Sequence, residues 1–105
     1  MKILFDQGTP IPLRRFLHPH VVDTAGERQW STLQNGDLLN AAEKDGYEVL
    51  LTTDQNLRYQ QNLTGRKIYI LVLCTTSWPR IRNQIDNVVE ALHNMPENGY
   101  LELRF

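Results

Sequence analysis

Two aspartates in this chain each follow a short apolar run. Residues 2–5 lead directly into Asp6, and residues 49–53 lead into Asp54. Both runs are brief and rich in aliphatic and β-branched residues, which predicts buried β-strands. In an α/β protein the carboxyl ends of parallel strands form the functional edge of the sheet. Two carboxylates delivered to that edge are typical of a site for a divalent metal ion.

The rest of the chain alternates predicted strands and helices. The strands are expected over 2–5, 20–24, 48–53, 67–73 and 99–104, and the helices over about 10–17, 36–45, 56–62 and from Pro79 onward. Alternating βαβ units predict a mostly parallel sheet with right-handed crossovers and helices on both faces. We therefore expect a three-layer, Rossmann-like α/β fold with a five-stranded sheet in the order 2-1-3-4-5.

Capping residues mark the ends of these helices. Thr9 is expected to cap the first helix, with Pro10 in its first position, and Asn35 is expected to cap the second. Gly46 is placed to end that second helix in a left-handed conformation, with Tyr47 packing back. Apolar residues at helical spacing from position 81 to 92 predict one long helix after Pro79.

The predicted strand order places strands 1 and 3 side by side, so Asp6 and Asp54 should lie about 5 Å apart. Asp37 begins the helix after strand 2 and should reach the same edge. Structural explanations remain open for two of the three acids. The helix dipole alone favours Asp37 in a first turn, and Asp54 could cap the following helix. Asp6 is harder to explain in that way, because Thr9 is expected to supply the cap there.

Composition narrows the classes of function. The chain has 105 residues with 11 basic and 12 acidic side chains, for a net charge of −1, so a nucleic-acid substrate would require a local basic patch or a bridging metal. The single cysteine, Cys74, fits a reducing compartment and core packing. No apolar run approaches the roughly 18 residues that cross a bilayer. We expect a soluble, cytoplasmic protein without a membrane partner.

Three segments together resemble a known family. Residues 3–10 run from a strand into Asp6, residues 35–42 begin a helix with Asp37, and residues 50–57 contain Thr-Thr-Asp-Gln-Asn. In this order and spacing they are similar to the PIN-like domains of the DUF5615 family, relatives of bacterial toxin ribonucleases. The resemblance covers nearly the whole chain, so residues 1–105 are expected to form a single PIN-like domain.

The resemblance implies a metal-dependent ribonuclease, in the role of the toxin of a toxin–antitoxin pair. It implies that Mg²⁺ or Mn²⁺ is held by three catalytic ligands, Asp6, Asp37 and Asp54. The accessory and substrate positions that it implies are Gln7, Thr53, Asn56 and Arg58. The implied partners are RNA and an antitoxin protein, and a homodimer is left open.

Two positions depart from the family pattern. Gln7 stands where a glutamate is common, and Asn56 stands where a second aspartate is common. Each replacement removes a negative charge from the expected site. The alternative is therefore a catalytically weakened PIN-like module that acts by binding protein or nucleic acid. Trp30 and Trp78, expected to be exposed in loops at the same edge, would suit partner contacts. Packing of a tryptophan under its loop is an equally open explanation.

A response-regulator receiver domain is another class of protein with a similar pattern of residues. It also carries an aspartate after strand 3, and Thr75 or Thr76 would suit its position after strand 4. A receiver needs a second acid beside the first strand and a lysine after strand 5. Here Asp6 stands alone and no lysine follows Lys67, which argues against this class.

Overall fold

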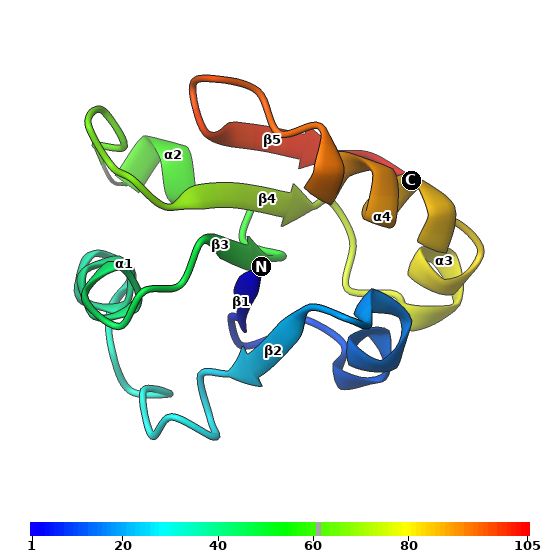
Figure 1. Cartoon of the computed structure of the whole chain (residues 1–105), viewed down its shortest axis with the longest axis horizontal. Helices are drawn as coiled ribbons and strands as arrows, with labels where there is room; N and C mark the ends of the chain where they lie inside the picture. Colours follow the sequence, from blue (N-terminus) through cyan, green and yellow to red (C-terminus); the bar gives the residue numbers. More distant parts are fainter. Residues whose placement is uncertain (61) are drawn as a thin grey trace.

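Five parallel strands form one sheet in the order β2-β1-β3-β4-β5, as the sequence predicted. The computed structural model of the protein describes residues 1–60 and 62–105. The strands are β1 (Lys2–Phe5), β2 (Val21–Thr24), β3 (Val49–Thr52), β4 (Tyr69–Leu73) and β5 (Tyr100–Leu103). Figure 1 shows β4 and β5 running side by side in the same direction. The sheet order reverses at the β1–β3 pair, which is where parallel α/β sheets bind ligands.

Helices cover both faces of the sheet. They are the 3-10 helix η1 (Ile11–Leu17) and the α-helices α1 (Asn35–Lys44), α2 (Leu57–Gln60), α3 (Trp78–Arg82) and α4 (Ile85–His93). The buried residues of η1, α3 and α4 pack on one face of the sheet, and those of α1 and α2 pack on the other. Figure 1 shows α1 across the strands from α3 and α4. The three-layer α/β architecture is thus confirmed.

Alternate residues of the central strands enter different cores. Leu51 belongs to the cluster under η1, α3 and α4, whereas Leu50 belongs to the cluster under α1 and α2. Both side chains are at most 1% exposed. Burial on both faces explains why these strands are continuous apolar runs rather than alternating ones. The edge strand β5 differs from the expected alternation, because its four residues are all partly buried.

The end of α1 follows the prediction closely. Gly46 has φ +83°, its N–H donates to the carbonyl of Glu43, and the Tyr47 N–H donates to the carbonyl of Ala42. This is a Schellman motif, in which glycine avoids the steric cost of the left-handed conformation. Tyr47 packs back with only 3% of its surface exposed.

Both predicted N-caps were wrong. The residue before η1 is Pro10, and the Thr9 hydroxyl instead donates to the carbonyl of Leu51, with Oγ1 and O 3.1 Å apart. The residue before α1 is Gln34, and Asn35 lies inside the first turn of the helix. In both cases the polar side chain bonds to a distant part of the chain rather than to its own helix.

The long helix expected after Pro79 is two helices. Ser77 caps α3 by accepting a hydrogen bond from the Arg80 N–H, so Trp78 begins a helix instead of lying in a loop. The helical path is interrupted at Gln84, whose φ of −129° and ψ of 34° are not helical. Residue 61, inside the helix expected over 56–62, lies outside the described residues. Within the described chain, no helix has the length and apolar character needed to span a membrane.

Candidate functional site

Asp6 and Asp54, which we call the strand-end acids, lie at the carboxyl ends of neighbouring strands. Asp6 directly follows β1, and its N–H donates to the carbonyl of Leu51 in β3 at 3.0 Å. Asp54 lies two residues beyond the end of β3. The two carboxylates are close enough for the charge of Asp54 to influence the ionisation of Asp6. The fold therefore brings these two acids together at the β1–β3 switch point.

Thr52 connects the strand-end acids. Its hydroxyl donates to Oδ2 of Asp6 at 2.9 Å and accepts a hydrogen bond from the N–H of Asp54 at 3.1 Å. The side chain is fully buried. Sequence reasoning chose the neighbouring Thr53 and missed Thr52. The available signal was a threonine at the end of an otherwise apolar buried strand, because a buried hydroxyl needs hydrogen-bond partners.

The environment of Asp6 opposes its negative charge. Burial is the main cause and raises the pKa of the Asp6 carboxyl above its ordinary value of 3.8, and the charge of Asp54 adds to this effect. The hydrogen bond from Thr52 and one from the Gln7 N–H, at 2.7 Å, offset part of it. The carboxylate is thus oriented by neutral donors but not neutralised.

Asp54 is held from two directions. Its Oδ1 accepts a hydrogen bond from the N–H of Asn56 at 2.9 Å, which forms an Asx turn just before α2. Its Oδ2 accepts a hydrogen bond from the side-chain amide of Asn35 at 3.1 Å. The first turn of α1 therefore reaches the strand-end acids, but it does so through Asn35.

Asp37 stays apart from them. Its side chain is exposed in the first turn of α1, and within the described residues no group of three or more His, Cys, Asp or Glu side chains could hold a metal ion. The helical repeat explains this arrangement. Asp37 is two positions after Asn35 and so points about 200° around the helix from the side chain that contacts Asp54.

The other predicted accessory residues make contacts of their own. Gln7 donates through its side-chain amide to the carbonyl of Ser31, at 2.9 Å, and so fastens the segment that follows β2. Asn56 is exposed and contributes its N–H to the Asx turn. Arg58 turns toward β5, where its Nε lies 3.7 Å from Glu102. None of the described contacts of Arg58 joins it to the strand-end acids.

Thr53 takes part in a close approach between two segments. Gly8 has φ +86°, and a Cβ atom on it would lie 2.9 Å from Oγ1 of Thr53. The loop after β1 therefore packs directly against the segment after β3. A side chain at position 8 would be excluded both by backbone conformation and by space.

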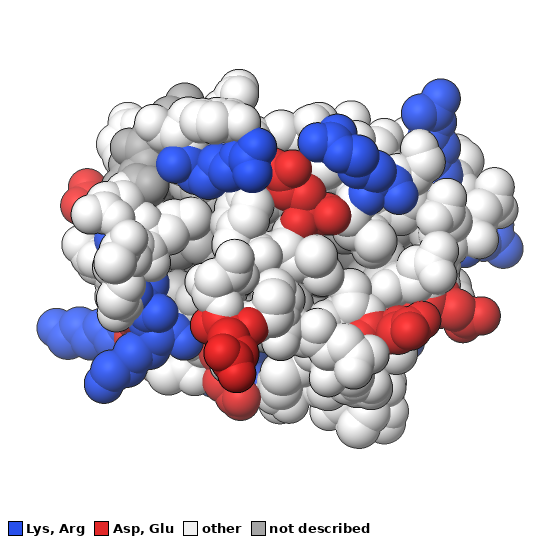
Figure 2. Space-filling model, turned by 90° about the horizontal axis from the view of Figure 1, so that it is seen from above, with Lys and Arg blue, Asp and Glu red and all other residues white. Residues whose placement is uncertain are grey.

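The charges around the strand-end acids are unbalanced. Among residues 1–60 and 62–105, no lysine or arginine forms an ion pair with Asp6 or Asp54. Figure 2 shows that basic and acidic side chains are interspersed on the face it displays, without a broad field of one sign.

The donor set fits a small hard cation. Both strand-end acids offer carboxylate oxygens, and each of these oxygens accepts one hydrogen bond and keeps a further lone pair. Mg²⁺ is commonly held by one or two carboxylates together with waters and substrate phosphates. Two carboxylates are thus enough for a site that is completed by its substrate.

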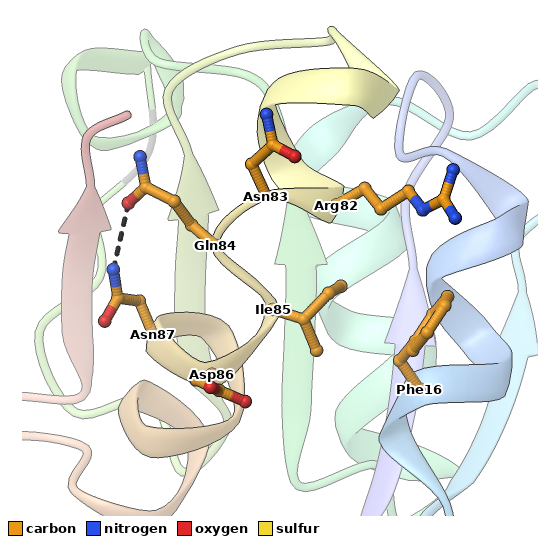
Figure 3. Close-up of a pocket in the computed structure, with 7 residues that line it drawn as sticks. All are labelled: Phe16, Arg82, Asn83, Gln84, Ile85, Asp86 and Asn87. Carbon is orange, nitrogen blue, oxygen red and sulfur yellow. Dashed lines mark hydrogen bonds between the residues drawn. The ribbon is translucent and has the colours of Figure 1, made fainter.

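A cavity of about 550 Å³ lies between η1 and the break between α3 and α4. Figure 3 shows Phe16, Arg82 and Ile85 along it, with the side-chain amides of Gln84 and Asn87 joined by a hydrogen bond of 2.9 Å. None of the predicted site residues lines this cavity.

The two tryptophans expected to be exposed are partly buried. Trp30 packs against the α1–α2 core and Trp78 against the opposite one. The Arg28 guanidinium lies 4.5 Å from the centre of the Trp30 ring. This packing favours a structural role for Trp30.

No family model matches the sequence, and comparisons with curated proteins and with solved structures found no match. The fold is therefore established by the structure, and the function is argued from the chemistry of the strand-end acids.

Proposed function

We propose that this protein is a PIN-like, Mg²⁺- or Mn²⁺-dependent ribonuclease whose metal is held by Asp6 and Asp54. The supporting observation is the pair itself: two carboxylates at the β1–β3 switch point, without a protein cation among the described residues. A buried carboxylate beside a second one costs stability unless a positive charge offsets them. A divalent cation is the simplest compensation.

When bound, such an ion would lower the pKa of a coordinated water and offset the charge that develops on the phosphate. The protein supplies the orientation. Thr52 fixes the Asp6 carboxylate, and Asn35 and the Asn56 N–H fix that of Asp54. Under this proposal Asp37, being exposed, contributes through water rather than by direct coordination.

The biological setting belongs to the same proposal. The substrate would be RNA in the cytoplasm, and a toxin of this kind would be restrained by an antitoxin protein. The chain has a net charge of −1, and the face in Figure 2 carries basic and acidic side chains interspersed, so this proposal assigns RNA recognition to the bridging metal. A homodimer would bring two such sites together.

A second function is favoured by one observation. Among the described residues, Asp37 does not join Asp6 and Asp54 in a group that could hold a metal ion, and the neutral Gln7 is engaged in a hydrogen bond to Ser31. A catalytically weakened PIN-like module would keep the same fold and bind protein or nucleic acid without cleaving it.

Cleavage of single-stranded RNA in the presence of Mn²⁺ separates the two functions. Asp54→Asn should reduce cleavage to the level of the metal-free reaction while the circular dichroism spectrum stays unchanged. Asp86→Asn, an exposed acid on α4, is the matched control and should retain wild-type activity. Wild-type protein that cleaves no RNA with any divalent metal would overturn the ribonuclease proposal and favour the binding module.

A further inference from the structure

A small cavity of about 220 Å³ adjoins Asp6. It lies between the segment that follows β1 and the segment that follows β2. Its lining runs from Phe5 through Thr9 and includes Ile11 and residues 24–26. Because Asp6 lines the cavity and is also one of the strand-end acids, a molecule in the cavity would touch the candidate metal site.

One side of the cavity is apolar. Ile11 leaves 62% of its surface exposed at the start of η1, and Ala25, which is only 2% exposed, also lines the cavity. A single exposed isoleucine is ordinary on a protein surface. Here, however, it borders a cavity, where it offers an aliphatic surface to a flat ring.

The rim of the cavity carries hydrogen-bonding groups. The hydroxyl oxygen of Thr24 accepts a hydrogen bond from the Glu27 N–H at 3.0 Å, which leaves its proton available for donation. The Gln7 amide nitrogen donates to Ser31, which leaves its carbonyl oxygen able to accept. One donor and one acceptor beside an apolar wall match the edge and the face of a nucleobase.

We propose that this cavity is the subsite for a nucleoside adjacent to the scissile phosphate. The volume is below the range of about 300–1,000 Å³ typical of sites for drug-sized ligands, so it suits one ring system rather than a stretch of nucleic acid. With the base in the cavity, the phosphate of the same nucleotide lies toward Asp6. The position of the phosphate rests on the proposed function, whereas binding of the base does not.

The shape of the cavity is fixed by contacts outside it. Gly8 packs against Thr53, and Gln7 is tied to Ser31. Position 26 is different, because a Cβ atom there would meet only Oγ1 of Thr24, at an ordinary 3.8 Å. Gly26 lines the cavity, so a side chain added there is a test of the cavity that leaves both strand-end acids unchanged in sequence.

NMR titration with each of the four ribonucleoside 5′-monophosphates tests the proposal, first in EDTA and then in Mg²⁺. At least one nucleotide, at concentrations up to about 10 mM, should shift the amide signals of Gln7, Gly8 and Gly26. Gly26→Leu should weaken that binding about tenfold or more, and Ile11→Ala should weaken it severalfold. Phe16→Ala, in the cavity beside α3 and α4, is the control and should bind as the wild type does.

Each outcome of the titration either supports or overturns the proposed subsite. Binding at these amides that Gly26→Leu weakens supports a nucleobase site in the cavity even if the protein cleaves no RNA, in which case only the proposed function and the position of the phosphate fail. RNA cleavage by a protein whose cavity amides respond to no nucleotide overturns the subsite and leaves the ribonuclease standing. Nucleotide-induced shifts confined to the α3–α4 cavity also overturn it. If Gly26→Leu does not fold, the exposed Ile11→Ala carries the same test.

Discussion

Two groups of acidic side chains in this protein differ in the partners that surround them. Asp23 and Asp45 belong to a cluster with Arg28 and Tyr47, which we call the Arg28–Tyr47 cluster. There Arg28 forms an ion pair with Asp45, and the Tyr47 hydroxyl donates to Asp23 at 2.6 Å and accepts from Arg28 at 3.1 Å. The strand-end acids receive hydrogen bonds from neutral groups alone among the described contacts.

Under the proposed function, this difference separates a cluster that stabilises the fold from a site that binds a metal ion. Burial and the bond to Asp23 raise the pKa of Tyr47 to about 12, so its hydroxyl remains a donor throughout the physiological range. The Arg28–Tyr47 cluster is therefore satisfied internally and needs no ligand. The strand-end acids carry charges that the described chain does not balance, which is expected of a site that takes a cation from solution.

Removing the ring of Tyr47 from the Arg28–Tyr47 cluster should have the largest effect on stability. Tyr47→Ala deletes a side chain that is 3% exposed and should lower the free energy of unfolding by about 3–5 kcal/mol. Urea denaturation measures this loss. Tyr59→Ala is the matched control, because Tyr59 is 72% exposed and its removal should change stability by no more than about 0.5 kcal/mol. Equal losses in the two variants would contradict the assignment of the cluster to stability.

Adding a divalent cation that binds the strand-end acids should have the next largest effect on stability. At a hundredfold excess over Kd, Mn²⁺ should stabilise the native state by about 2.7 kcal/mol. For a chain of this length that is a rise in melting temperature of roughly 10 °C. Asp6→Asn should abolish the rise, whereas Asp45→Asn should retain it. A rise that survives Asp6→Asn would place the metal elsewhere.

The pH dependence of stability should show the strain on Asp6. Because burial raises its pKa above 3.8, the folded state binds this proton more tightly than the unfolded state does. The resulting stabilisation is fully present below the ordinary pKa and is lost as the pH rises through the raised value. Metal-free Asp6→Asn should therefore be at least as stable as the wild type at pH 7, with a gain of no more than about 1 kcal/mol.

Urea midpoints for both proteins at pH 4 and pH 7 measure that difference. A loss of several kcal/mol in metal-free Asp6→Asn would instead identify Asp6 as a structural hydrogen-bonding residue, and the proposed metal site would be wrong.

The smallest effect on stability is expected at the ion pair between Arg28 and Asp45 in the Arg28–Tyr47 cluster. Arg28 and Asp45 leave 34% and 36% of their side chains exposed. Asp45→Asn should therefore cost no more than about 1 kcal/mol, and the cost should shrink as salt is added. Thermal melts at low and high ionic strength provide the measurement. A larger, salt-independent loss would show that the cluster depends on Asp45 as much as on Tyr47.

Local sequence patterns predicted the sheet because they report burial. The apolar runs at β1, β3 and β4 are bounded by turn residues, and their alternation with helices predicted the strand order. The glycine at position 46 predicted the end of α1. The placement of Asp6 and Asp54 at neighbouring strand ends depended on the same information.

The predictions that failed depended on partners far along the chain. The Thr9 hydroxyl bonds to a carbonyl 42 positions away, and Thr52 bonds to Asp6 across 46 positions. A capping rule considers only the next few residues, so it could not anticipate either contact. Asp37 shows the same limit, because the α1 side chain that reaches Asp54 is that of Asn35, and Asp37, two positions later, points about 200° around the helix from it.

The strand order also determines how the sheet can assemble during synthesis. Once β1 has paired with β2 and β3, β4 and then β5 are added at the same side in the order in which they are made. Until residues 100–103 leave the ribosome, the Tyr-Ile-Leu-Val-Leu sequence of β4 is an open edge. Such an apolar edge can pair with other chains. By pairing with β4, the four residues of β5 cover that edge in the folded chain, whereas a chain that ends before them would leave it open. This role is separate from anything that occurs at the strand ends.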